Sequence, residues 1–185
     1  MRPVSALFLL TLGLTLAADP AAAVQPKAVT IKLNKLSAPA PAGWVNEKPK
    51  YTLRSYQFQL PAAEKDGHAG EFIVMPESDP KADKVFPRWK VQFLPPDGKT
   101  VDDISKVSKL DLKGTTVDLL DVTGTWKYRE RPFDPKSKEE LREDYRVVWA
   151  VVGEKDEASH IRLSGPKELV DKNYPAFEAW LKALK

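Results

Sequence analysis

The stretch RVVWAVV, residues 146–152, decides the fold class of this 185-residue chain. After its first residue it is continuously apolar, without the alternation that a strand with one wet face shows. A short, valine-rich apolar run is typical of a β-strand that is covered on both sides. We therefore expect a central strand at 146–152, with other elements packed against both of its faces.

Further strands are predicted on both sides of this stretch. SHIRL, residues 159–163, follows a charged turn and is expected to be the hairpin partner of 146–152. Alternating or apolar runs bounded by turn residues predict the earlier strands, at 29–33, 51–60, 71–75, 106–112 and 116–126. The segment 127–145 is rich in charges of both signs, which predicts a solvated loop with a short helix over 137–142.

Two stretches, 79–94 and 166–184, have helical spacing. Their apolar stripes consist of Val85, Trp89 and Phe93 in the first, and Leu169, Val170, Tyr174, Phe177, Trp180, Leu181 and Leu184 in the second. Pro87 places the start of the first regular helix near it, because proline is tolerated only in the first turn. Each helix must pack its apolar stripe against a sheet, and the central strand must be covered on both faces. These two requirements predict an α+β fold: a mainly antiparallel sheet with helices packed on both faces.

The first 23 residues, MRPVSALFLLTLGLTLAADPAAA, have the layout of a secretory signal peptide. Arg2 supplies the positive charge, and the apolar run 4–16 is shorter than the roughly 20 residues that cross a bilayer. Small residues fit cleavage after Ala18 or Ala23. We expect an exported protein, periplasmic or extracellular, with no stable membrane anchor after signal cleavage.

Composition limits the domain count and the partners. After residues 1–23 are removed, the chain has the size of one domain, with an extended Pro-rich segment at 24–50 and a single α/β domain at 51–185. Because cysteine is absent, disulfides, thiolate metal sites and cysteine nucleophiles are excluded. The 29 basic and 26 acidic residues are interspersed, so no polybasic segment for nucleic acid exists.

No stretch carries a motif of known chemistry. His68 and His160 lack an HExxH pattern or a cluster of metal ligands, and no serine lies in a Gly-x-Ser-x-Gly elbow. HIRLSGPKELV, residues 160–170, lacks phosphate-loop spacing, and Glu168 would compete with an anion at the start of the helix. We therefore predict no catalytic residues, no cofactor and no metal site.

The five tryptophans are the most distinctive residues of the sequence. Trp89, Trp149 and Trp180 fall on predicted core stripes, which indicates packing. Trp44 and Trp126 lie near loops or strand ends, where rigid aromatic rings give a large contact area at a small entropic cost. They are the candidate residues for a groove that holds a ligand or partner.

The order of the elements resembles a group of small exported bacterial proteins of unassigned function, whose architecture is similar to the PsbP-like α/β/α sandwich. The resemblance extends from about residue 51 to 184 and is carried by FQLP, GEFIV, RWKVQF, VTGTW and IRLSGPKELVDKNYPAFEAWL. These motifs contain packing residues, and none is catalytic. The resemblance therefore implies a fold and no specific activity.

Three functional hypotheses follow. The first is a non-enzymatic binding or accessory module of the bacterial envelope, whose partner is a protein or a small ligand. The second is a hydrolase with a spatially assembled site, in which His68 or His160 acts with a carboxylate in a closed pocket. The third is a carrier of a small apolar ligand in a groove between sheet and helix.

Overall fold

The computed structural model describes residues 29–61, 68–77, 81–112, 114–131, 134–154 and 157–185. The predicted signal peptide and both of its cleavage sites lie outside the described residues. Within the described part, no helix is long and apolar enough to span a membrane.

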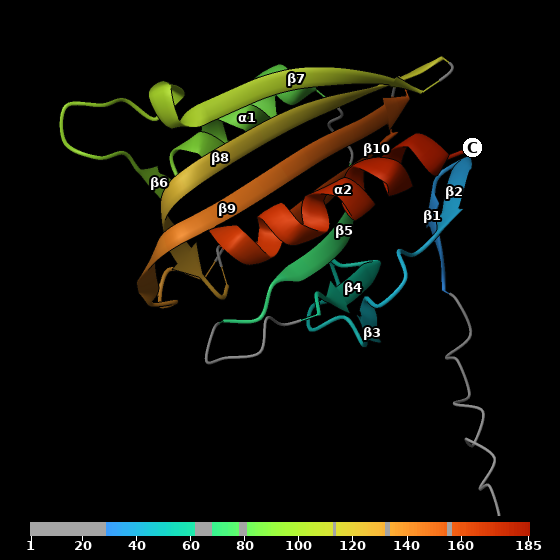
Figure 1. Cartoon of the computed structure of the whole chain (residues 1–185), viewed down its shortest axis with the longest axis horizontal. Helices are drawn as coiled ribbons and strands as arrows, with labels where there is room; N and C mark the ends of the chain where they lie inside the picture. The colour runs from blue at the N-terminus through green and yellow to red at the C-terminus, as the bar shows by residue number, and fades with distance from the viewer. Residues whose placement is uncertain (1–28, 62–67, 78–80, 113, 132–133, 155–156) are drawn as a thin grey trace, which may run out of the picture.

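An antiparallel sheet of eight strands is the largest structural unit of the described chain (Figure 1). Its order is β3-β4-β5-β10-β9-β8-β6, and β7 also pairs with β8. The strands are β3 Val45–Glu47, β4 Tyr56–Gln59, β5 Glu71–Glu77, β6 Phe93–Leu94, β7 Ser105–Leu112, β8 Thr115–Arg129, β9 Glu139–Glu154 and β10 Glu157–Pro166. The predicted mainly antiparallel sheet is confirmed, since every strand pair in it is antiparallel.

The remaining described elements are short or lie outside this sheet. β1 (Thr30–Leu33) and β2 (Leu36–Pro39) form a separate two-stranded sheet, and a 3₁₀-helix covers Asp102–Ile104. The two α-helices are α1, Ala82–Lys90, and α2, Lys167–Ala183. The segment expected to be extended, 24–50, thus contains β1, β2 and β3 in its described part.

β9 lies between β10 and β8, and its residues alternate between two hydrophobic clusters. Val148, Ala150 and Val152 belong to one cluster, and the intervening residues Val147, Trp149 and Val151 belong to the other. All six side chains are at most 4% exposed. The prediction of a central strand covered on both sides is therefore confirmed.

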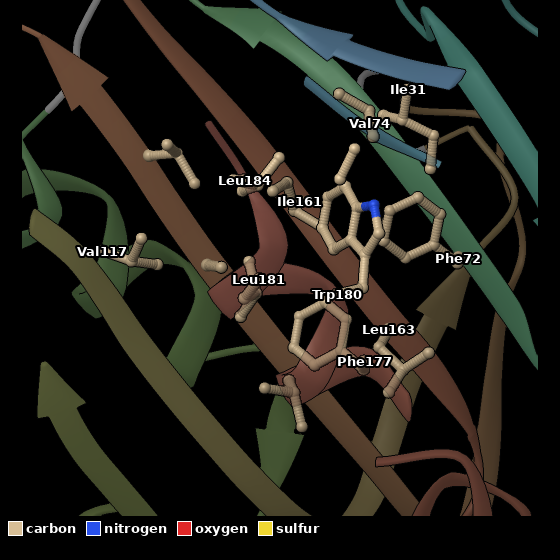
Figure 2. Packing of buried hydrophobic residues seen from close by; sticks show 14 of the residues in the cluster. Ile31, Phe72, Val74, Val117, Ile161, Leu163, Phe177, Trp180, Leu181 and Leu184 are labelled. Atoms are coloured by element: carbon tan, nitrogen blue, oxygen red, sulfur yellow. The ribbon is translucent and has the colours of Figure 1, made fainter. Parts of the chain in front are cut away.

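Each helix belongs to one of the two clusters. α2 contributes Phe177, Trp180 and Leu181 to the cluster shown in Figure 2, where they meet strand residues such as Phe72 and Leu163. α1 contributes Val85 and Phe86, with Trp89 packed alongside, to the other cluster. Because α1 has nine residues and α2 has 17, the sheet dominates, and a sandwich with helices across both faces stays a prediction.

The structure corrects the loop and short helix predicted within 127–145. β8 continues to Arg129 and β9 begins at Glu139, and these two residues pair across the strands. Their side chains form an ion pair with an N–O distance of 3.1 Å. Opposite charges on facing strand positions stabilise the pair of strands, so a charged segment is compatible with a hairpin.

The first helix also differs from expectation. α1 begins at Ala82, so Pro87 lies inside it, and Phe93 belongs to β6. Pro87 leaves the carbonyl of Asp83 without an intrahelical N–H partner, but the helical hydrogen bonding continues, since the Val91 N–H donates to the carbonyl of Pro87 over 3.3 Å. The helix ends at Lys90, before residue 94.

Candidate functional site

A cavity of about 690 Å³ lies between two segments of the chain that are distant in sequence. On one side are residues 50–54, which precede β4, and on the other are residues 128–131 together with Asp134, at the end of β8. Ile73 and Met75 of β5 and Arg162 of β10 complete the lining. A volume in this range suits a small organic ligand.

The alternation of β5 shows on which side of the sheet the cavity lies. Phe72 and Val74 point into the α2 cluster. Since successive strand side chains point to opposite faces, Glu71, Ile73 and Met75 point the other way. The cavity therefore opens on the face of the sheet opposite α2.

The carboxylate of Glu71 is held between two arginines beside the cavity. Arg54 donates from Nη1 to Oε2 of Glu71 over 2.9 Å, and Arg162 donates from Nη2 to Oε1. Burial alone would raise the pKa of Glu71, but the two guanidinium groups hold this pKa below its usual range. Glu71 is therefore ionised at neutral pH and is poorly suited to proton transfer.

A chain of hydrogen bonds attaches the segment before β4 to this ion pair. Gln57, whose side chain is buried, accepts from Nη1 of Arg54 over 2.8 Å and from the backbone N–H of Lys50 over 3.1 Å. Its amide group donates to Glu47 over 2.8 Å. The residues that form one wall of the cavity are thus fixed to the sheet before any ligand binds.

Aromatic rings and arginines alternate beside Tyr128 and Arg162, which line the cavity. The guanidinium carbon of Arg142 lies 3.5 Å from the ring centre of Tyr128 and 5.5 Å from that of Tyr145. The guanidinium of Arg162 lies over the ring of Trp126, at 5.1 Å. Stacking of planar guanidinium groups on aromatic faces stabilises both partners and limits their rotation.

A β-bulge brings the stacked groups of β9 to one face of the sheet. The register between β8 and β9 shifts between Gly124 and Trp126, and Asp144 on β9 has a φ of 55°. The extra residue brings Arg142 and Tyr145, three positions apart, to one face of the sheet, where their side chains are hydrogen-bonded at 3.4 Å. Without the bulge, strict alternation would place them on opposite faces.

A second, smaller cavity of about 250 Å³ lies beside the first and shares Lys50 and Tyr128 with it. Its lining is more polar and includes Gln57, Gln59 and His68. The two cavities therefore offer neighbouring environments: the larger combines aliphatic and aromatic side chains with charged ones, and the smaller is lined mainly by amide, charged and aromatic groups.

The structure separates the two tryptophans predicted for a groove. Trp44 is buried in the α2 cluster, and its indole Nε1 donates to Asn173 over 3.2 Å. Trp126 is buried in the other cluster, donates to Gln92 over 3.3 Å and lines the smaller cavity. Only Trp126 thus lies at the candidate site, and the groove formed by both residues stays a prediction.

The histidines are not brought into a closed catalytic pocket. His68 lines the smaller cavity 3.6 Å from Glu140, but both side chains are about half exposed. His160 is buried, with its ring packed edge-on against Trp89 at 5.1 Å. Among the described residues, no group of three or more His, Asp or Glu side chains is placed to bind a metal ion.

The stretch 160–170 also has a structural role in the fold. Lys167 Nζ lies 2.5 Å from the carboxylate of Asp171, one helical turn further along α2. Asp171 also accepts from Arg146 over 2.8 Å. The lysine that follows the Ser-Gly-Pro turn is thus paired within the fold.

Glu71 and Arg162 are site residues that the sequence did not predict. Arg162 interrupts the apolar run of β10 and Glu71 directly precedes the apolar run of β5, which is the signal that could have drawn attention to them. Their partnership depends on the register in which Arg162 pairs with Ile73 and Ser164 pairs with Glu71. No local pattern reveals that register.

Comparisons with known proteins bear on the fold alone. No family model and no curated protein matches the chain. The solution structure of cyanobacterial PsbP (CyanoP) from Synechocystis sp. PCC 6803 is similar to this structure with a TM-score of 0.50 and 12% sequence identity, over 92% of this chain and 98% of that chain. The fold is PsbP-like.

A second similar structure is that of PA94, a protein of unknown function from Pseudomonas aeruginosa. It has a TM-score of 0.43 and 14% identity over 84% of this chain and 94% of that chain. At this TM-score the similarity does not bear on the fold of this chain. Identities this low say nothing about activity, so function must be argued from the site.

Proposed function

We propose that this protein is an exported, non-enzymatic binding module of the bacterial envelope that holds a small ligand in the 690 Å³ cavity. The observation that carries the proposal is the cavity itself, which combines a ligand-sized volume with walls fixed by the Glu71 ion pairs. The signal-peptide pattern of residues 1–23 supports export.

The walls of the cavity favour a ligand with an apolar body. Leu53, Ile73 and Met75 supply aliphatic surface, and Tyr51 and Tyr128 supply aromatic rings. Leu53 is 62% exposed, so its apolar surface is available to a ligand. A ligand that covered it would remove apolar surface from water and gain binding free energy.

We further propose that α1 and α2 cover opposite faces of the sheet, as in an α/β/α sandwich. In support of this, α1 shares a cluster with Leu120, Val122 and Trp149, and α2 shares a cluster with Leu119 and Val148. The short α1 leaves part of its face open, and this open part contains the cavity.

Titration with N-phenyl-1-naphthylamine, an uncharged dye that fluoresces in apolar sites, tests the proposed binding activity. The wild-type protein should bind it saturably. Met75→Trp, which fills the cavity, should weaken binding at least tenfold, and Leu53→Ser should weaken it about threefold through lost apolar contact.

The matched control is Val91→Trp, which introduces the same ring at an exposed apolar position outside both cavities. It should leave binding unchanged. Thermal melting of each variant verifies that it is folded. Non-saturable binding to the wild type, or full binding to Met75→Trp, would contradict the proposed function.

A further inference from the structure

We propose that the ligand is a small organic anion whose charged group is bound by the Lys50 ammonium and the Tyr128 hydroxyl, at the junction of the two cavities. This inference rests on the proposed function and specifies its ligand class. It assigns an apolar body to the larger cavity and a carboxylate-like or sulfonate-like head to the junction.

The lining of the larger cavity holds more basic than acidic side chains. Five basic side chains line the larger cavity, together with two acidic ones. The basic residues are Lys50, Arg54, Arg129, Arg131 and Arg162, and the acidic ones are Glu130 and Asp134. Even with both carboxylates ionised, the walls carry an excess of positive charge. An excess of one sign within a concave site attracts ligands of the opposite charge.

Ion pairs within the fold neutralise part of this positive charge. Arg129 pairs with Glu139, and Arg131 lies 3.9 Å from Asp134. Arg54 and Arg162 share the single carboxylate of Glu71, so these three groups together carry one net positive charge. The ammonium of Lys50 adds a second positive charge, against the single carboxylate of Glu130. Arg54 and Arg162 are partly buried. An additional anion near them would therefore interact with them more strongly than it would in water, because charge interactions are strengthened where water is excluded.

Lys50 is the basic group of the lining that is left for a ligand. Its backbone N–H is used by Gln57, whereas its ammonium forms no ion pair with any described residue. Lys50 is exposed and lines both cavities, so it lies at the boundary of the space proposed for a ligand head. An ammonium group is a compact charge with three donors, which suits a carboxylate or sulfonate.

Tyr128 supplies the second donor at the junction. Its ring is fixed by the guanidinium of Arg142, and among the hydrogen bonds of the described residues none uses its hydroxyl. Burial and the charge of Glu71 raise the pKa of Tyr128, so the hydroxyl keeps its proton at neutral pH. Because Tyr128 and Lys50 line the same two cavities, the protonated hydroxyl and the ammonium can donate to the same anionic head.

Two dyes with the same aromatic body test the inference. 1-Anilinonaphthalene-8-sulfonate carries a sulfonate, and N-phenyl-1-naphthylamine is its uncharged counterpart. The wild-type protein should bind the sulfonate at least fivefold more tightly in low salt, and Met75→Trp should abolish the binding of both dyes. Lys50→Gln and Tyr128→Phe should each weaken sulfonate binding about threefold or more, while binding of the uncharged dye stays within twofold.

Lys48→Gln is the matched control, because Lys48 is an exposed lysine two residues away that lines neither cavity. It should leave both affinities unchanged. Equal affinity of the wild type for the two dyes, or a sulfonate preference that survives in the double variant Lys50→Gln/Tyr128→Phe, would overturn the inference and leave the proposed function standing. If neither dye bound saturably, both would fail.

Discussion

At the scale of single residues, Glu71 links the fold to the site. It receives charged hydrogen bonds from Arg54, in the segment before β4, and from Arg162, in β10. These arginines also stack on aromatic rings, Arg54 on Tyr51 and Arg162 on Trp126. The carboxylate of Glu71 thus holds Arg54 and Arg162, which line the cavity, in place. These two ion pairs form only when the carboxylate is ionised.

The substitution Glu71→Gln should therefore destabilise the protein in a pH-dependent way. The pKa of Glu71 is below 4.5 in the folded state, so its ionised form stabilises the fold above pH 4.5, and this contribution is lost as pH falls through the lowered pKa. At pH 7 the variant should lose about 3 kcal/mol of unfolding free energy. The loss should shrink progressively below pH 4.5.

Urea denaturation at pH 7, 4 and 2.5 measures this difference. Glu178→Gln is a suitable control, because Glu178 forms an exposed pair with Lys182 one turn along α2 and such pairs contribute at most about 0.5 kcal/mol. A difference between wild type and Glu71→Gln that was the same at all three pH values would show that the charge of Glu71 does not stabilise the fold.

At the scale of elements, α2 is held by its apolar stripe. Phe177 is fully buried and lies 6.2 Å, between ring centres, from Phe72 of β5 and from Trp180 of α2 itself (Figure 2). The helix is also tied at its start, where Arg146 of β9 pairs with Asp171. Since exposed ion pairs contribute little, packing should dominate the docking of this helix.

Phe177→Ala tests which interaction holds α2. Removing the ring leaves a cavity between helix and sheet, so the unfolding free energy should fall by about 3–5 kcal/mol. Asp171→Ala, which removes two ion pairs from the same helix, should cost no more than about 1 kcal/mol. Chemical denaturation of the two variants checks the comparison, and similar losses would mean that charge, not packing, docks α2.

At the scale of the whole molecule, the two hydrophobic clusters share β8, β9 and β10 as their common boundary. Alternate residues of β9 pack in the two clusters. If β9 unfolded, its contacts in both clusters would be lost together. The folded domain should therefore unfold as a unit, although α1 and α2 lie in different clusters.

Phe86→Ala in the α1 cluster and Phe177→Ala in the α2 cluster should each shift a single unfolding transition. Far-ultraviolet circular dichroism and tryptophan fluorescence should report the same midpoint, because the buried tryptophans are distributed over both clusters. Two separated transitions in either variant would show that the clusters unfold independently.

The sequence predicted those elements whose signal is local. The apolar run at 146–152 and the stripe of α2 indicate buried surfaces directly, because burial imposes a composition on each element. The stretch 127–145 was predicted as a loop with a short helix, but β8 and β9 extend into it as far as Arg129 and Glu139, since its charges are satisfied across a hairpin. A cross-strand partner does not show in a sequence window.

By itself, the sequence determined that this chain has a doubly covered central strand, an antiparallel sheet and two helices with apolar stripes. Only the tertiary structure decided where the charged residues meet. Glu71 and Arg162 are 91 residues apart, and Arg142 shares a face with Tyr145 because of a bulge. Apolar burial is read from local periodicity, whereas a site depends on strand order and register, which arise from contacts over the whole chain.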